Sequence, residues 1–123
     1  MLFTEFERDE MRMSCLFCGM VDGTVPCDCV FRDDDVLVIR DVRPQAPTHL
    51  LVIPTVHVES VDAVEDPSLW SRIMDRARRV AGEFKLHEEG YRLVINCGTL
   101  AGQTIPHLHI HLLAGRPFRW PPG

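Results

Sequence analysis

The chain has 123 residues, of which 46% are hydrophobic and 25% are charged, the balance of an ordinary soluble domain. Its formal charge of −5 disfavours nucleic-acid polymers and acidic membranes as partners, because it leaves no basic excess to neutralise phosphates. No apolar run is long enough to span a bilayer, and residues 1–12 contain no apolar signal core. These features predict a cytoplasmic protein that does not bind membranes.

The elements expected along the chain are short strands around one long helix. Residues 1–13 predict an N-terminal tail that is mobile or partly helical, and residues 14–123 predict the domain itself. A short helical turn is expected at 14–22, and strands are expected at 30–32, 36–40, 50–53, 91–95 and 105–113. Apolar residues recur at helical spacing from Trp70 to Phe84, after the capping pair Asp66-Pro67, and Gly90 fits a stop beyond them. This order predicts an α+β fold with a mostly antiparallel sheet.

Three of the six histidines stand at alternate positions in the last expected strand, as His107, His109 and His111. Side chains alternate along a strand, so these imidazoles share one face while the apolar residues between them share the other. An imidazole titrates near neutral pH, so such a face suits a nucleophile, a base or an acid. It also suits a zinc site, or it is a plain polar face. The pattern alone leaves these alternatives open.

The loop before these histidines carries the glycines Gly98 and Gly102, followed by Gln103 and Thr104. Glycines let backbone N–H groups approach an anion closely, and the two polar side chains add donors. Beside three imidazoles, this loop is interpreted as a phosphate cradle. No P-loop motif is present in the sequence, so a P-loop hydrolase is excluded.

These residues resemble the signature of the histidine triad (HIT) superfamily, and the resemblance runs from Cys15 to the end. The stretch Asp41 to Pro54 is similar to a second family segment, and Asn96 to Gln103 to a third. Trp120-Pro-Pro-Gly123 is similar to the end of the histidine triad nucleotide-binding (Hint) branch. The resemblance implies a homodimer whose five-stranded sheets join into one ten-stranded sheet. It implies hydrolysis of purine nucleoside phosphoramidates to a nucleoside monophosphate and an amine, with no organic cofactor.

The resemblance also implies site residues. His109 is the expected nucleophile that forms a nucleotidyl-histidine intermediate, His111 contacts the phosphate or leaving group, and His49 and His107 support a proton relay. The expected nucleotide-binding residues are Leu16, Phe17, Met20, Ile39, Asp41, Val42, Asn96, Gly102, Gln103, Thr104, His109, His111 and, reaching the partner's active site, Trp120. A phosphoramidate's amine leaves well only when it is protonated, which agrees with an acid beside the nucleophile. The apolar residues expected to line the base pocket carry no code that separates adenine from guanine.

A zinc site is the second expectation. Cys15-Leu-Phe-Cys18 resembles a pair that binds zinc with two histidines in many bacterial HIT proteins, and those histidines map to His49 and His107. Two thiolates and two imidazoles form a closed structural site. With zinc bound, catalysis would rest on His109 and His111. Cys27, Cys29 and Cys97 receive no role, and His57 and His87 are expected to be structural or solvated.

Two other functions compete with the hydrolase. One is a nucleotide-binding interaction module in which turnover is incidental. The other is a hydrolase of dinucleoside polyphosphates or a nucleotidyl transferase, in which glutamine often replaces the third histidine. His111 and the Trp-Pro-Pro-Gly end favour the phosphoramidate hydrolase.

Overall fold

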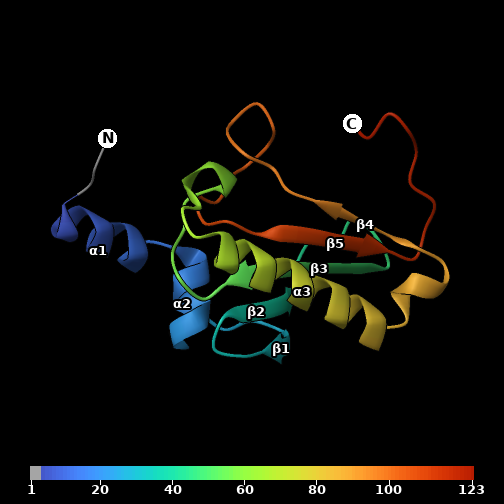
Figure 1. The fold of residues 1–123 in the computed structure, drawn as a ribbon, viewed down its shortest axis with the longest axis horizontal. Helices are drawn as coiled ribbons and strands as arrows, with labels where there is room; N and C mark the ends of the chain where they lie inside the picture. The colour runs from blue at the N-terminus through green and yellow to red at the C-terminus, as the bar shows by residue number, and fades with distance from the viewer. Residues whose placement is uncertain (1–3) are drawn as a thin grey trace.

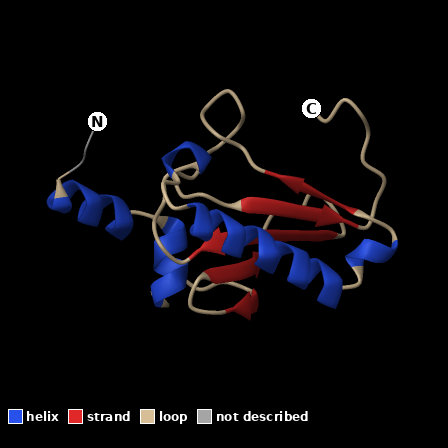
Figure 2. Ribbon diagram, in the orientation of Figure 1, coloured by secondary structure: helices blue, strands red, loops and turns tan. Residues whose placement is uncertain are grey.

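The computed structural model describes residues 4–123, which form a five-stranded antiparallel sheet accompanied by one long helix (Figure 1). The strands stand in the order β1-β2-β3-β5-β4, and Figure 2 shows them in red among the helices. They are β1 (Cys29–Arg32), β2 (Val36–Arg40), β3 (Thr48–Pro54), β4 (Tyr91–Val94) and β5 (Ile110–Ala114). The helices are α1 (Glu5–Met13), α2 (Leu16–Asp22) and α3 (Pro67–Glu83), with 3-10 turns at Val61–Ala63 and Leu86–Glu88. The predicted fold class is confirmed.

Helix α3 begins where the sequence predicts, because Asp66 accepts a hydrogen bond from the N–H of Ser68 at 2.9 Å. Its apolar stripe, which includes Ile73, Ala77 and Val80, is buried against the sheet. Gly90 does not end the helix directly. The chain first passes through the 3-10 turn and then adopts a positive φ of 102° at Gly90.

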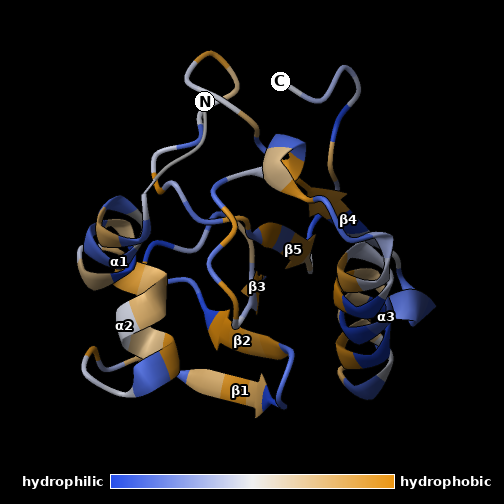
Figure 3. Ribbon diagram, turned by 60° about the vertical axis from the view of Figure 1, so that its left-hand side comes forward, coloured by the Kyte–Doolittle hydropathy of each residue, from blue (hydrophilic) through white to orange (hydrophobic). Residues whose placement is uncertain are grey.

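The sheet separates two apolar layers, with α3 on one side and α2 on the other (Figure 3). Alternation along β2 and β3 sends side chains to each layer in turn. The α3 layer contains Val36, Val38, Leu50, Val52, Leu108, Ile110 and Leu112. The α2 layer contains Cys15, Phe17, Leu37, Ile39, Leu51 and Ile53. The side chains of His49, His109 and His111 have the opposite parity to the α3 layer and therefore face the α2 side.

The last strand is shorter than predicted, since β5 begins at Ile110 rather than at residue 105. Pro106 has no N–H to give to a ladder. The N–H of His107 bonds the carbonyl of Ile105 at 2.8 Å, and that of Leu108 bonds Val58 at 2.7 Å. His107 and His109 therefore lie on a bent segment that leads into the strand. The expected burial of Leu108, by contrast, is observed.

The N-terminal segment contains helix α1, which Thr4 and Glu7 begin with a reciprocal capping box. Helix α1 projects beside α2 at one end of the molecule (Figure 1). Residues 1–3 of the expected tail lie outside the described residues. Within residues 4–123, no helix has the length and hydrophobicity needed to cross a membrane.

Candidate functional site

Two thiols and two imidazoles meet at the start of α2. Cys15 Sγ lies 3.2 Å from His107 Nδ1, and Cys18 Sγ lies 3.6 Å from the same nitrogen. The Nδ1 atom of His57 completes the group, 3.2 Å from Cys18 Sγ. All four ligand atoms lie within 4.8 Å of one another. We call Cys15, Cys18, His57 and His107 the thiol–imidazole cluster.

Local structure aims these four side chains inward. Cys15 precedes the first residue of α2, and its sulfur accepts the N–H of Cys18 at 3.4 Å, so one helical turn brings both thiols together. The Nε2–H of His107 donates to the carbonyl of Pro54 at 2.9 Å, which leaves the lone pair of Nδ1 directed at the sulfurs. A ring held through its second nitrogen by a carbonyl is the usual arrangement of a metal-binding histidine.

The electrostatics of the cluster fit a cation. Burial lowers the pKa of His107 to about 4 and also lowers the pKa of His57, so both rings are neutral at physiological pH. Burial and the neighbouring Cys15 thiol raise the pKa of Cys18 to about 12. A divalent ion reverses that shift, because it stabilises the thiolates directly. The donor set and its burial therefore fit Zn²⁺.

His57, rather than His49, belongs to this cluster. The expectation that His49 would be the fourth ligand is corrected by the register of the sheet, in which His49 pairs with Leu113 at the far end of β5. The end of β3, three residues before His57, lies instead beside the side chain of His107. In an antiparallel pair, the start of β3 lies near the end of β5, and the end of β3 lies near the start of β5. His57, which follows the end of β3, therefore lies nearer to His107 than His49 does.

The second group of histidines contains His109, which is 8% exposed. Its Nδ1–H donates to the backbone carbonyl of His107 at 2.7 Å. Because a neutral imidazole has one N–H, its Nε2 then carries the lone pair. The ring also contacts Phe17 edge to face, with 5.1 Å between centroids. His109 therefore presents an oriented Nε2 lone pair on the α2 side of the sheet.

His49 and His111 form a hydrogen-bonded chain beside His109. The N–H of Gln45 donates to His49 Nδ1 at 3.0 Å, so the proton of His49 stands on Nε2. That proton is donated to His111 Nδ1 at 2.9 Å, which leaves His111 with an Nε2–H. The carboxylate of Asp41 lies 3.5 Å from His49 Nε2. We call Asp41, His49 and His111 the relay group.

The relay group could also be taken for a metal site, since its three ligand atoms lie within 4.8 Å of one another. The two nitrogens, however, already share a proton along the line between them, so their lone pairs do not converge on a common point. Burial, followed by the nearby His109 and His49, lowers the pKa of His111 to about 4. Burial lowers the pKa of His49 as well, against the opposing effect of Asp41. His49 and His111 are therefore a neutral hydrogen-bonded pair beside the Asp41 carboxylate.

The loop that carries Gly98 and Gly102, which we call the glycine loop, is closed by the side chain of Gln103. Its amide oxygen accepts the N–H of Gly98 at 3.0 Å, and its amide nitrogen donates to Glu59 at 2.8 Å and to Ile105 at 3.1 Å. This side chain therefore holds the loop together, although the sequence suggested it as a phosphate donor. A cleft of about 470 Å³ adjoins it, lined by Glu59, Ser60, Asp62, Cys97, Gly98, Thr99, Gln103, Thr104 and Pro106.

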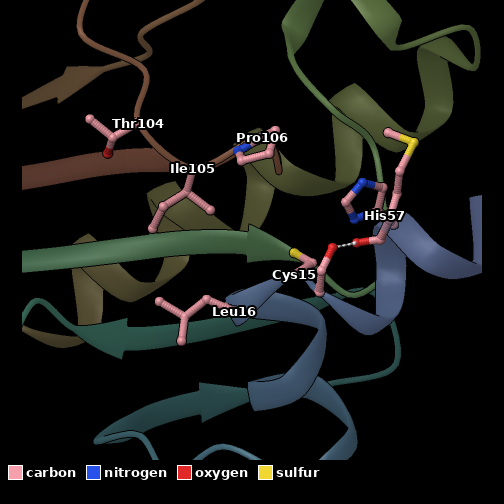
Figure 4. Close-up of a pocket in the computed structure, with 8 residues that line it drawn as sticks. Cys15, Leu16, His57, Thr104, Ile105 and Pro106 are labelled. Carbon is pink, nitrogen blue, oxygen red and sulfur yellow. Dashed lines mark hydrogen bonds between the residues drawn. The ribbon is translucent and has the colours of Figure 1, made fainter.

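The remaining expected nucleotide residues differ in exposure. Phe17 and Ile39 are buried in the α2 layer, with Met20 at its border. Leu16 is 44% exposed, Val42 90% and Trp120 84%. A smaller apolar pocket of about 220 Å³ lies between helix α1, the thiol–imidazole cluster and residues 104–106, with Leu16, Ile105 and Pro106 in its wall (Figure 4).

Comparison with known proteins places this geometry in one family. Residues 22–118 match the model of the HIT domain. The chain is 40% identical to an uncharacterized HIT-like protein of Synechocystis over 115 residues, covering 92% of this chain and 100% of the relative. It belongs to the HIT domain family.

Solved structures agree with that assignment. A HIT family hydrolase from Legionella pneumophila is 46% identical, with a TM-score of 0.86, over 89% of this chain and 100% of that one. A Zn-bound histidine triad family protein from Mycobacterium smegmatis is 33% identical, with a TM-score of 0.78, over 85% of this chain and 77% of that one.

Proposed function

We propose that this chain hydrolyses purine nucleoside phosphoramidates, with His109 as the nucleophile and a nucleotidyl-histidine intermediate. The observation that carries the proposal is the pair of complementary tautomers. His109 has a lone pair on Nε2, while His111 beside it has a hydrogen on Nε2, and their ring centroids are 5.1 Å apart. A phosphoryl group between them would meet a nucleophile and a donor together.

In the first step, Nε2 of His109 attacks the α-phosphorus and the phosphorus–nitrogen bond breaks. The leaving nitrogen takes a proton from solvent, and the amine departs. The positive charge that forms on His109 is stabilised through its Nδ1–H by the carbonyl of His107. His111 donates a hydrogen bond from its Nε2–H to the phosphate or the leaving group and keeps this proton, and His49 holds it in that tautomer. Water then cleaves the nucleotidyl-histidine bond, which yields the nucleoside monophosphate and returns a proton to solvent.

The nucleotide would occupy the α2 side of the sheet. In this proposal Asp41 hydrogen-bonds the ribose, and Asn96, Gly102 and Thr104 bind the phosphate region. Phe17 and Ile39 form the floor of the base pocket, since both are buried, while Leu16, Met20 and Val42 border it. Backbone groups of the loop replace the side chain of Gln103, which is already bound within the loop.

A structural Zn²⁺ held by Cys15, Cys18, His57 and His107 is part of the proposal. The support is the set of two sulfurs and two nitrogens converging on one point, together with a relative whose name records bound zinc. Zinc would fix the start of α2 and residue 107. His107 then acts as a ligand rather than a proton relay, and the chemistry rests on His109, His111 and His49.

The proposal also includes a homodimer in the cytoplasm, in which Trp120 of one protomer reaches the active site of the other. Trp120 is 84% exposed in the single chain, as a residue that packs on a partner would be. All five cysteines are free thiols, which suits a reducing compartment.

The test is incubation with an adenosine phosphoramidate, comparing wild type with His109→Ala and His109→Asn. Wild type is expected to release AMP and the amine, and rapid-quench mass spectrometry is expected to find a nucleotidyl adduct on His109. Folding of the variants is checked by circular dichroism. Binding of AMP by a wild type that turns over no phosphoramidate would instead identify a binding module. Preferential turnover of a dinucleoside polyphosphate would identify the other branch of the family.

A further inference from the structure

The segment that follows β5 folds back onto the loop that precedes β3. The two meet because Thr48 pairs with Ala114 at the end of the ladder. Gly115 has a positive φ of 97°, and a Cβ there would lie 2.8 Å from Pro47. Only glycine permits both the turn and this close approach. The contact brings the next residue, Arg116, to the loop that contains Gln45.

The side chain of Arg116 binds the backbone of that loop. Its Nε–H donates to the carbonyl of Gln45 at 3.0 Å, and a terminal nitrogen donates to the carbonyl of Pro117 at 3.0 Å. The guanidinium stacks on Phe118, with its carbon 4.3 Å from the ring centroid, and Arg92 approaches the same ring at 5.2 Å. A planar cation fixed by two carbonyls and an aromatic ring holds a defined position.

Gln45 is the residue on which the relay depends. Its N–H, donated to His49 Nδ1, occupies the lone pair there and so keeps the proton on Nε2, which the Asp41 carboxylate at 3.5 Å also favours. Pro44 and Pro47 have no N–H, so they add no backbone donor to the same loop. A hydrogen bond from Arg116 to the carbonyl of residue 45 restrains rotation of that residue, and with it the direction of its N–H.

We propose that Arg116 is a positioning residue: by holding Gln45, it keeps His49 in the Nε2–H tautomer that donates to His111. The role in catalysis rests on the proposed hydrolase function, but the effect on the tautomer does not. Loss of Arg116 releases Gln45, so His49 can also populate the Nδ1–H form. In that form His49 cannot donate to His111, and the Nε2–H of His111 is no longer specified.

The test compares Arg116→Gln and Arg116→Lys with a matched control, Arg119→Gln, in the same exposed C-terminal segment. Full-length protein labelled with ¹⁵N-histidine reports the tautomer of each ring, and His49→Asn identifies the His49 signals. In wild type and the control, His49 Nδ1 is expected to be unprotonated. Arg116→Gln is expected to show a mixture of the two tautomers. Its kcat on the phosphoramidate is expected to fall about tenfold with KM within about twofold, as misplacement of a positioned group does.

Arg116→Lys keeps one donor and is expected to recover part of the wild-type tautomer population and kcat. Should Arg116→Gln prove unfolded by circular dichroism, Phe118→Leu removes the stack while retaining Arg116, and a smaller change in the same direction is expected. The proposal is overturned when the His49 tautomer in Arg116→Gln, or in a folded Phe118→Leu, equals that of Arg119→Gln. A wild type without turnover defeats the hydrolase proposal alone, because the tautomer measurement still decides the role of Arg116.

Discussion

The two histidine groups use the same residue type for opposite purposes. In the thiol–imidazole cluster, His107 gives one N–H to a backbone carbonyl and directs its remaining lone pair toward two sulfurs. In the relay group, His49 and His111 satisfy one another, and the outermost N–H is left for a ligand. The partner of one ring nitrogen therefore decides whether the other nitrogen presents a lone pair or an N–H.

Residue 107 joins the thiol–imidazole cluster to His109, which lies beside the relay group. Its side chain belongs to the thiol–imidazole cluster, while its backbone carbonyl accepts the Nδ1–H of His109. The bent backbone before β5 makes this double use possible, because the residue is not committed to a strand ladder. Substitutions in one group test whether zinc binding by the thiol–imidazole cluster and catalysis by the histidines on the α2 side are independent of each other.

The largest expected effect follows from removing the nucleophile. His109→Asn is expected to lower kcat/KM for an adenosine phosphoramidate by at least about 10⁴-fold, since a covalent route needs this nitrogen. The thiol–imidazole cluster does not include the His109 side chain, so zinc content is expected to stay at the wild-type level. Steady-state kinetics and metal analysis of the same preparation check both statements. Turnover near the wild-type rate would refute the covalent mechanism.

The next effect concerns metal removal. Chelation of zinc, or Cys18→Ser, is expected to lower Tm by about 10 °C or more, because structural zinc contributes directly to folding free energy. Metal analysis of protein purified without added zinc is expected to find about one ion per chain. Cys27→Ser is the control, since Cys27 is exposed and lies outside the thiol–imidazole cluster. A stoichiometry near zero in wild type would end the zinc proposal.

The sharpest separation comes from a pair of matched histidine substitutions. His57→Asn is expected to lose zinc and stability. His49→Asn is expected to keep zinc and to lower kcat about 100-fold, because misplacement of a positioned group costs about that much. Metal content, Tm and kcat of both variants distinguish the groups. Zinc loss in His49→Asn with zinc retained in His57→Asn would restore the assignment made from sequence alone.

The wrong prediction of His49 as a zinc ligand shows that sequence patterns predict local features better than contacts between strands. The cap at Asp66, the apolar stripe of α3 and the alternation of Leu108 and Ile110 are local, and all appear as predicted. Choosing between His49 and His57 instead needs the register of β3 against β5. That register follows from antiparallel pairing, but only once the pairing partners of the strand are known.

The hydrogen-bond partners of His49 and Gln103 could not be predicted from the spacing of residues in the sequence. The backbone N–H that fixes His49 comes from Gln45, and a backbone group looks the same in every sequence. Gln103 lies in the glycine loop, but its amide bonds the N–H of Gly98 and the carbonyl of Glu59, of which the second is remote in sequence. The residue types of a site are therefore more predictable than the partners of their individual atoms.

The smallest expected effect is the dependence of stability on pH. The pKa of His111 is lowered to about 4 by burial, while in the unfolded chain it has its ordinary value near 6.5. The unfolded state therefore binds more protons between these values, and this contribution to stability is lost as pH falls from about 6.5 to about 4. The pKa of His49 is lowered as well and acts in the same direction.

Between pH 7 and pH 5, the Tm of wild type is expected to fall by a few degrees more than that of His111→Asn, which lacks the titrating ring. The carboxylates whose pKa is lowered, such as Asp33 and Asp66, remain ionised throughout this range and contribute little to the difference. Both proteins retain the thiol–imidazole cluster, so any release of zinc at acid pH lowers both Tm values and cancels in the difference. Equal slopes in the two proteins would show that His111 titrates normally in the fold. The relay would then be an open, solvated pair rather than the buried neutral one that distinguishes it from the thiol–imidazole cluster.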